Sequence, residues 1–159
     1  MDRRSVSSVR GAIGRDEIER LSPRARAEIR VYYPYHWFVS RAPGRRVHFL
    51  VDARTGLVAT ADPFHTETRE VAAEDVLDAA VGEDEARQRV RRHAARTQYR
   101  AGNGGLFDNG LVHKPFWILS LSSPPGKRLR MLVDGITGRV HPLACTAGSG
   151  LAEADDPVR

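Results

Sequence analysis

The chain contains the same succession of sequence features twice, with the copies starting about eighty residues apart. Each copy has a tryptophan, a turn rich in glycine and proline, an apolar segment and the pattern Asp-x-x-Thr-Gly. The first copy runs from Trp37 to Val58 and the second from Trp117 to Val140, and these are the only two tryptophans. A duplicated unit constrains the architecture strongly, because two copies of one supersecondary unit bury their apolar faces together.

Each copy has the pattern of a three-stranded β-meander. If residues 42–45 form the first hairpin turn, Trp37 lies opposite Leu50 and Val39 lies opposite His48. Both faces of this hairpin are then largely apolar. We therefore expect the sheet to be covered by helices on one face and by the other copy or a partner on the other.

The Asp-x-x-Thr-Gly pattern predicts a turn between the second and third strand of each copy. The aspartate carboxylate accepts backbone N–H groups two or three residues further on, and the glycine adopts a positive φ. A catalytic carboxylate pair is the alternative interpretation of the recurring aspartates. The turn is favoured because it explains both the acid and the glycine. The residues assigned to the two turns are Asp52, Thr55, Gly56, Asp134, Thr137 and Gly138.

Helical patterns precede both copies. A short helix is expected over residues 16–21, and Ser22-Pro23 predicts a second helix over residues 23–30. A further helix is expected over residues 71–81. The clearest helix covers residues 83–100, with an acidic first turn and a basic remainder, as the helix dipole favours.

These patterns predict an α+β fold of two helix–β-meander repeats, with antiparallel sheets packed against helices and a pseudo-two-fold relation between the repeats. The predicted parts are a disordered N-terminus over 1–12 and a first repeat over 13–62. A linker helix and the second repeat follow over 63–142. The residues 143–159 are expected to form a flexible acidic tail.

The succession of helix, tryptophan-containing strand, glycine turn, apolar strand and Asp-x-x-Thr-Gly-x-Val resembles the PepSY family. The matching residues are Trp37 to Val58 and Trp117 to Val140, with the acidic helix start at residues 83–86 ahead of the second meander. Together they cover about half of the chain. The resemblance implies a small binding or inhibitory module without catalytic residues of its own.

The net charge of +5 permits a polyanion partner. However, 23 of the 25 basic residues are arginines and they are spread along the chain, so a solvated surface is the favoured explanation. The candidate polyanion-binding residues lie in the first hairpin and along the helix over 83–100. They are Arg45, Arg46, Arg89, Arg92, Arg96 and Arg100.

Aromatic residues crowd the first strand, and arginines flank them. Protein interfaces and single-stranded nucleic-acid platforms both use this combination, although packing in a small core explains it more simply. The candidate ligand-binding or partner-binding residues are Tyr33, Tyr35, His36, Trp37 and Trp117.

The sequence shows no arrangement that is diagnostic of catalysis. The single cysteine, Cys145, excludes an intrachain disulfide and lies in a segment of small residues. No pair of the six histidines has the spacing of a helical zinc site, so no metal and no cofactor are expected.

The sequence contains neither an apolar run of about 20 residues nor a signal peptide, which predicts a cytoplasmic protein. The leading functional hypothesis is a non-enzymatic module that contacts a protein or a small ligand through an aromatic sheet face, with a homodimer plausible. A nucleic-acid-binding protein is the alternative, and an enzyme ranks last.

Overall fold

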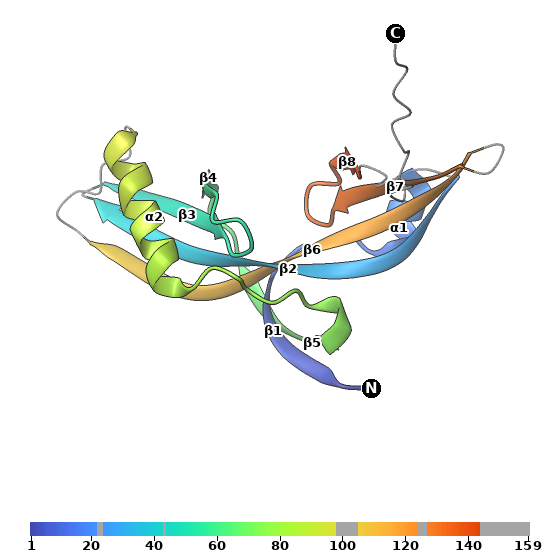
Figure 1. Cartoon of the computed structure of the whole chain (residues 1–159), viewed down its shortest axis with the longest axis horizontal. Coiled ribbons are helices and arrows are strands. Elements are labelled where there is room, and N and C mark those ends of the chain that lie inside the picture. The colour runs from blue at the N-terminus through green and yellow to red at the C-terminus, as the bar shows by residue number, and fades with distance from the viewer. Residues whose placement is uncertain (22–23, 43, 98–104, 124–126, 144–159) are drawn as a thin grey trace, which may run out of the picture.

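The computed structural model describes residues 1–21, 24–42, 44–97, 105–123 and 127–143. In these ranges, eight strands form one mixed sheet, accompanied by two α-helices and one short 3-10 helix (Figure 1). Neither α-helix in the described ranges is long and apolar enough to cross a membrane.

Two long strands form the centre of the sheet. Strand β2 covers Ala25–Ala42 and strand β6 covers Leu106–Ser123, and they pair antiparallel from Ala25–Leu121 to Ser40–Leu106. Their β-branched and aromatic residues favour extended backbone over these unusual lengths of 18 residues each. The two strands cross near the middle of the molecule in Figure 1, as expected from strand twist accumulating along a long pair.

Two shorter strands extend the sheet at each end of this pair. Strand β3 (Arg45–Asp52) pairs with β2, and β4 (Val58–Ala61) pairs with β3. At the other end, β7 (Lys127–Asp134) pairs with β6, and β8 (Val140–Pro142) pairs with β7. The predicted pairing of Trp37 with Leu50 and of Val39 with His48 is confirmed.

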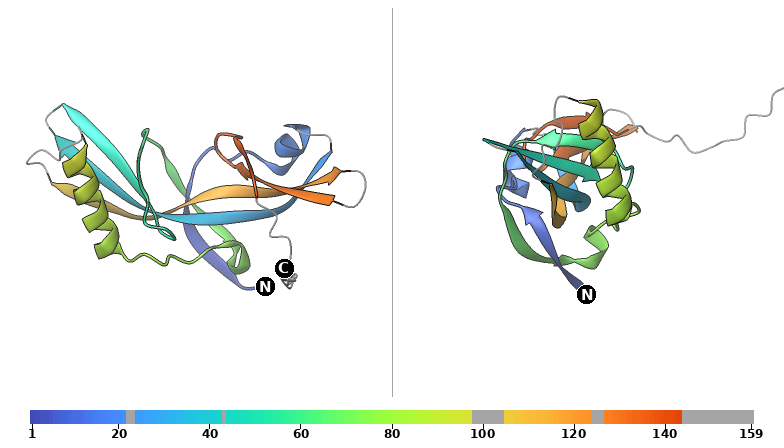
Figure 2. Two further views of the ribbon diagram at one scale, coloured as in Figure 1. Left: turned by 45° about the horizontal axis from the view of Figure 1, so that its top comes forward. Right: turned by 90° about the vertical axis from the view of Figure 1, so that its left-hand side faces the viewer.

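A second antiparallel ribbon runs across the direction of the central pair (Figure 2). It consists of β1 (Arg3–Val9) and β5 (Thr66–Ala72), and β1 joins β6 through a parallel bridge between Ser8 and His113. The 3-10 helix η1 (Ala73–Asp75) follows β5. Tyr32 of β2 packs on this ribbon in a small core with Val6, Val71 and Val76.

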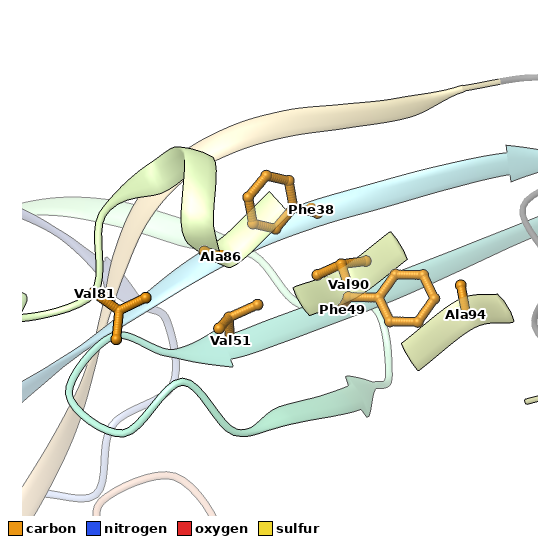
Figure 3. Close-up of a cluster of buried hydrophobic side chains, with 7 residues drawn as sticks. All are labelled: Phe38, Phe49, Val51, Val81, Ala86, Val90 and Ala94. Atoms are coloured by element: carbon orange, nitrogen blue, oxygen red, sulfur yellow. The ribbon is translucent and has the colours of Figure 1, made fainter. Parts of the chain in front are cut away.

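Each α-helix covers the hairpin that belongs to the other half of the sequence. Helix α2 (Glu83–Arg96), which precedes β6, packs on β2 and β3 (Figure 3). Helix α1 (Arg15–Leu21), which precedes β2, contributes Ile18 to a core with β6, β7 and the start of β2. The buried side chains of the α2 core are Phe38, Phe49, Val51, Val81, Ala86, Val90 and Ala94. Those of the α1 core are Ile18, Ala25, Ala27, Trp117, Leu119 and Val133.

Matching hydrogen bonds hold the chain where it enters each helix. The His36 ring Nε2 lies 2.6 Å from the Val81 carbonyl oxygen, just before α2. The Trp117 indole Nε1 donates to the Ile13 carbonyl at 3.0 Å, just before α1. Trp117 therefore corresponds to His36, and the two tryptophans do not occupy corresponding positions.

The predicted fold class is wrong. Because β2 and β6 pair along almost their whole lengths, the two meanders merge into one eight-stranded mixed sheet. The described residues contain only two α-helices. Helix α2 packs on β2 and β3, and α1 packs on β6 and β7 together with the start of β2, so no separate helix–β-meander repeat exists.

Three expected local structures are also wrong. Residues 1–12 contain strand β1 in place of a disordered segment, because Val6 and Val9 are buried when β1 pairs with β5. Residues 25–30 begin β2 in place of a helix, with Ala25 and Ala27 buried against α1. In the range 71–81, where a helix was expected, β5 ends at Ala72 and the only helical residues are the three of η1.

The other two helices expected from the sequence are present. Helices are confirmed over Arg15–Leu21 and Glu83–Arg96. Residues 98–100, at the end of the longer expected helix, and the tail from residue 144 onward lie outside the described residues.

Candidate functional site

An apolar groove lies on the face of the β2–β6 pair opposite the helices. Alternation along β2 buries Tyr32, His36 and Phe38 on the helix side and leaves Tyr33 and Tyr35 half-buried on the other side. The cavity volume is about 500 Å³. We call it the aromatic groove, and its lining residues are Val31, Tyr33, Tyr35, Leu77, Phe116, Ile118 and Leu132.

Four chain segments build the aromatic groove. Tyr33 and Tyr35 come from β2, Phe116 and Ile118 come from β6, and β7 adds one leucine. Leu77 follows η1 and is held beside β2 because its backbone N–H donates to the Tyr32 carbonyl at 3.1 Å. The groove therefore depends on the pairing of segments that are far apart in the sequence.

Aromatic rings form one wall of the groove. The rings of Tyr33 and Tyr35 have centroids 5.4 Å apart at an angle of 47°. Tyr33 meets Phe116 edge-on, at 6.1 Å and 77°. These tilted and edge-to-face contacts are favourable geometries for aromatic pairs and hold the rings in place.

Two carboxylates border the groove. The Tyr33 hydroxyl donates to both oxygens of Asp52, at 2.9 and 3.1 Å. The Lys114 ammonium donates to Asp134 at 2.5 Å and lies 5.5 Å from the Phe116 ring centroid. In Figure 1, the turns after β3 and β7 that carry these aspartates rise on one side of the β2–β6 crossing, and β1 and β5 lie on the other side.

Both aspartates are held in the charged form. Burial by itself raises the pKa of Asp52, but the N–H groups of Thr55 and Arg54 and the Tyr33 hydroxyl outweigh it and bring the pKa below its usual value. Burial likewise acts on Asp134, where the Lys114 ammonium and two backbone N–H groups lower the pKa.

Both tyrosines are held in the neutral form. Burial and the hydrogen bond to Asp52 raise the pKa of Tyr33 to about 12. Burial, followed by the negative charge of Asp52, raises the pKa of Tyr35 well above its usual value, and the charge of Asp134 adds to the effect. The phenols therefore act as neutral hydrogen-bond donors and apolar surface, which suits binding more than proton transfer.

The structure places the six predicted turn residues at the two turns, with Asp52 and Asp134 as the last residues of β3 and β7. The Asp52 carboxylate accepts the N–H groups of Arg54 and Thr55, at 2.8 and 2.9 Å. The Asp134 carboxylate accepts the corresponding N–H groups in the second turn, at 2.9 and 3.1 Å. Gly56 and Gly138 have φ values of +78° and +71°.

Of the five predicted ligand-binding residues, only Tyr33 and Tyr35 line the groove. His36 is buried on the helix side. Trp37 stacks on His48 with centroids 5.8 Å apart, and its indole N–H donates to His48 Nδ1 at 3.1 Å. Trp117 is buried against α1.

The predicted arginine row does not form one free surface. The Arg89 guanidinium binds Glu85 and also donates to the Gly56 carbonyl at 3.4 Å. Arg45, Arg46, Arg92 and Arg96 are exposed, and Arg100 lies outside the described residues.

A second cavity of about 550 Å³ lies near α1. Its wall includes Trp117 with the Arg30 guanidinium 4.4 Å from the ring centroid. Arg3 and Arg15 share this wall with Glu28, Glu70 and Asp75, so the charges of the lining residues are balanced.

Sequence reasoning missed five groove residues, which are Val31, Leu77, Phe116, Ile118 and Leu132. The sequence signal that could have found Phe116 is the alternation of side chains along β6, which places Phe116 and its neighbour Trp117 on opposite faces of the sheet. The alternation identifies Phe116 as a groove residue only when the pairing of β2 with β6 is known, because that pairing puts Phe116 on the same face as Tyr33 and Tyr35.

Within the part of the chain that the structure describes, no group of three or more histidine, cysteine, aspartate or glutamate residues is placed to hold a metal ion. Cys145 lies outside that part. No protein-family model, curated protein or solved structure matches this chain, and the resemblance to the PepSY family therefore stays a prediction.

Proposed function

We propose that this protein is a non-enzymatic binding module that holds a small apolar ligand in the aromatic groove. The observation that carries the proposal is the groove itself, a cavity of about 500 Å³ lined by large apolar and aromatic side chains. Pockets for small organic ligands commonly measure about 300–1,000 Å³ and have such a lining.

The exposure of the lining side chains supports the proposal. The side chains on the opposite face of β2 are buried under α2 or on the β1–β5 ribbon, whereas Tyr33, Tyr35 and Phe116 stay partly exposed. Removing apolar surface from water contributes about 25 cal/mol per Å², so a ligand that covers these rings gains binding free energy.

The state of the polar groups also favours binding over chemistry. The two tyrosines are neutral, and both aspartates are engaged by turn N–H groups. A protein partner, a homodimer, nucleic-acid binding and a cytoplasmic location stay predictions from the sequence.

A titration with indole, a neutral and water-soluble aromatic probe, tests the proposal by two-dimensional NMR of the labelled protein. We expect saturable shifts at the amides of Tyr35, Leu77 and Phe116. Substitution Phe116→Ala weakens binding by about tenfold because it removes one wall of the groove.

Phe107→Ala is the matched control, since Phe107 lies on the same strand, is 46% exposed and does not line the groove. We expect this variant to bind indole as the unaltered protein does. The proposal fails if indole shifts none of the groove amides, or if the two phenylalanine variants lose affinity equally.

A further inference from the structure

We infer that the ligand of the aromatic groove carries a positively charged ammonium group, bound beside Asp52 and the Tyr35 ring. The inference rests on the proposed function and adds the chemical class of the ligand, an organic cation with an apolar body.

The pairing of β2 with β6 is centred on Tyr33 and Lys114, which lie opposite each other. Two residues along each strand, Tyr35 pairs with Val112 on one side and Phe116 pairs with Val31 on the other. Lys114 thus corresponds to Tyr33, and Phe116 corresponds to Tyr35.

The neighbouring hairpins follow the same correspondence. Asp52 lies opposite Tyr35, and Asp134 lies opposite Phe116. The residue after each aspartate donates its N–H to a proline carbonyl, from Ala53 to Pro34 at 3.1 Å and from Gly135 to Pro115 at 2.9 Å.

The second side of the groove already contains an ammonium group. Lys114 Nζ lies 2.5 Å from the Asp134 carboxylate and 5.5 Å from the centre of the Phe116 ring. A carboxylate and an aromatic face together satisfy an ammonium, because the ring quadrupole adds to the attraction of the carboxylate. Lys114 and Asp134 lie beside the lining residues, and their arrangement shows how a carboxylate and a groove ring together hold a cation at this edge.

The first side has the carboxylate and the ring but no ammonium of its own. Tyr33 stands where Lys114 stands on the other side, and its neutral hydroxyl donates to Asp52 without cancelling the negative charge. Among the described residues, no cationic side chain forms an ion pair with Asp52. The nearby Arg54 guanidinium donates to the Asp78 carbonyl instead, at 3.1 Å.

A ligand ammonium completes this side of the groove. Its charge compensates Asp52, the Tyr35 ring offers it an aromatic face, and the apolar body of the ligand covers Phe116 and Leu77. A partly buried carboxylate without a cationic partner discriminates against anions and gives neutral molecules no comparable gain.

The test compares phenyltrimethylammonium with tert-butylbenzene, its neutral counterpart of the same shape. Binding of each probe is followed by two-dimensional NMR at the groove amides. We expect the cation to bind at least tenfold more tightly than the neutral probe. Asp52→Asn keeps an oxygen acceptor for the turn and removes the charge, and it should abolish most of this preference.

Asp62→Asn is the control, because it removes one negative charge at an exposed position outside the groove. We expect it to keep the preference for the cation. Equal affinity for the two probes, or a preference that survives Asp52→Asn, overturns the inference and leaves the proposed function standing. If neither probe shifts the groove amides, the proposed function itself fails.

Discussion

At the level of single residues, the turn after β7 comes close to the backbone of β6 at its centre. The Gly135 N–H donates to the Pro115 carbonyl at 2.9 Å. A Cβ atom added to Gly135 would lie 2.4 Å from that carbonyl oxygen, and real Cβ atoms essentially never come so close. The glycine is therefore required by space, since its φ is not in the left-handed region.

Substitution Gly135→Ala tests this requirement. The added methyl group pushes the turn away from β6, and we expect the free energy of unfolding to fall by about 2 kcal/mol. Urea denaturation followed by circular dichroism measures the change. Gly14→Ala is the control because a Cβ there meets no atom within 4 Å, and a comparable loss in both variants would contradict the steric explanation.

Single residues also differ in whether their roles depend on chain neighbours or on strand register. The turn roles of Asp52 and Asp134 were predictable, because a carboxylate that accepts N–H groups two and three residues later involves only neighbours in the chain. The correspondence of the tryptophans was not predictable in this way. Trp37 pairs two residues before Asp52, whereas Trp117 pairs one residue before Asp134, and one residue moves a side chain to the opposite face.

At the scale of secondary-structure elements, α1 depends on its contact with the far hairpin. A helix of seven residues is too short to be stable in water alone. Ile18 is fully buried against Trp117, Leu119 and Val133, and this contact supplies the stabilisation.

Substitution Ile18→Ala should lower the free energy of unfolding by about 2–4 kcal/mol through the cavity that it leaves. In a Trp37→Phe background, the emission of Trp117 should shift to longer wavelength, because water reaches the indole when α1 loosens. Glu17→Ala, on the exposed face of the same helix, should change the stability by no more than about 0.5 kcal/mol. Unchanged Trp117 emission in the Ile18 variant would contradict this account of α1.

Elements whose own residues determine them were predicted well. Helix α2 has an acidic first turn and an apolar stripe, and the β2–β3 hairpin has a short turn between alternating strands. The helix expected at the start of β2 rested on the preference of Ser22-Pro23 for a helix start. Pairing with β6 overrides that preference, since it satisfies the backbone of this segment in a sheet.

At the scale of the whole molecule, neither half has a complete core. The hairpin of β2 and β3 is covered by α2, and that of β6 and β7 is covered by α1. A chain that ends before residue 63 therefore lacks both the pairing partner of β2 and the helix that buries Phe38 and Phe49.

We expect the fragment 1–62 to be unfolded alone and to fold when it is mixed with the fragment 63–159. Circular dichroism and two-dimensional NMR of each fragment and of the mixture measure this. Well-dispersed NMR spectra from an isolated fragment would show that the halves are independent and would contradict the crossed packing of the helices.

The two hairpins, their aspartate turns and helix α2 follow from the amino-acid sequence, because each depends on residues that are close in the chain. The pairing of β2 with β6, the covering of each hairpin by a distant helix and the choice of the open apolar face arise only when the chain folds. Both faces of the hairpins are apolar, so periodicity alone does not tell the core side from the groove side. Contacts between residues about eighty positions apart make that choice, and they bring Tyr33, Tyr35 and Phe116 together in the aromatic groove.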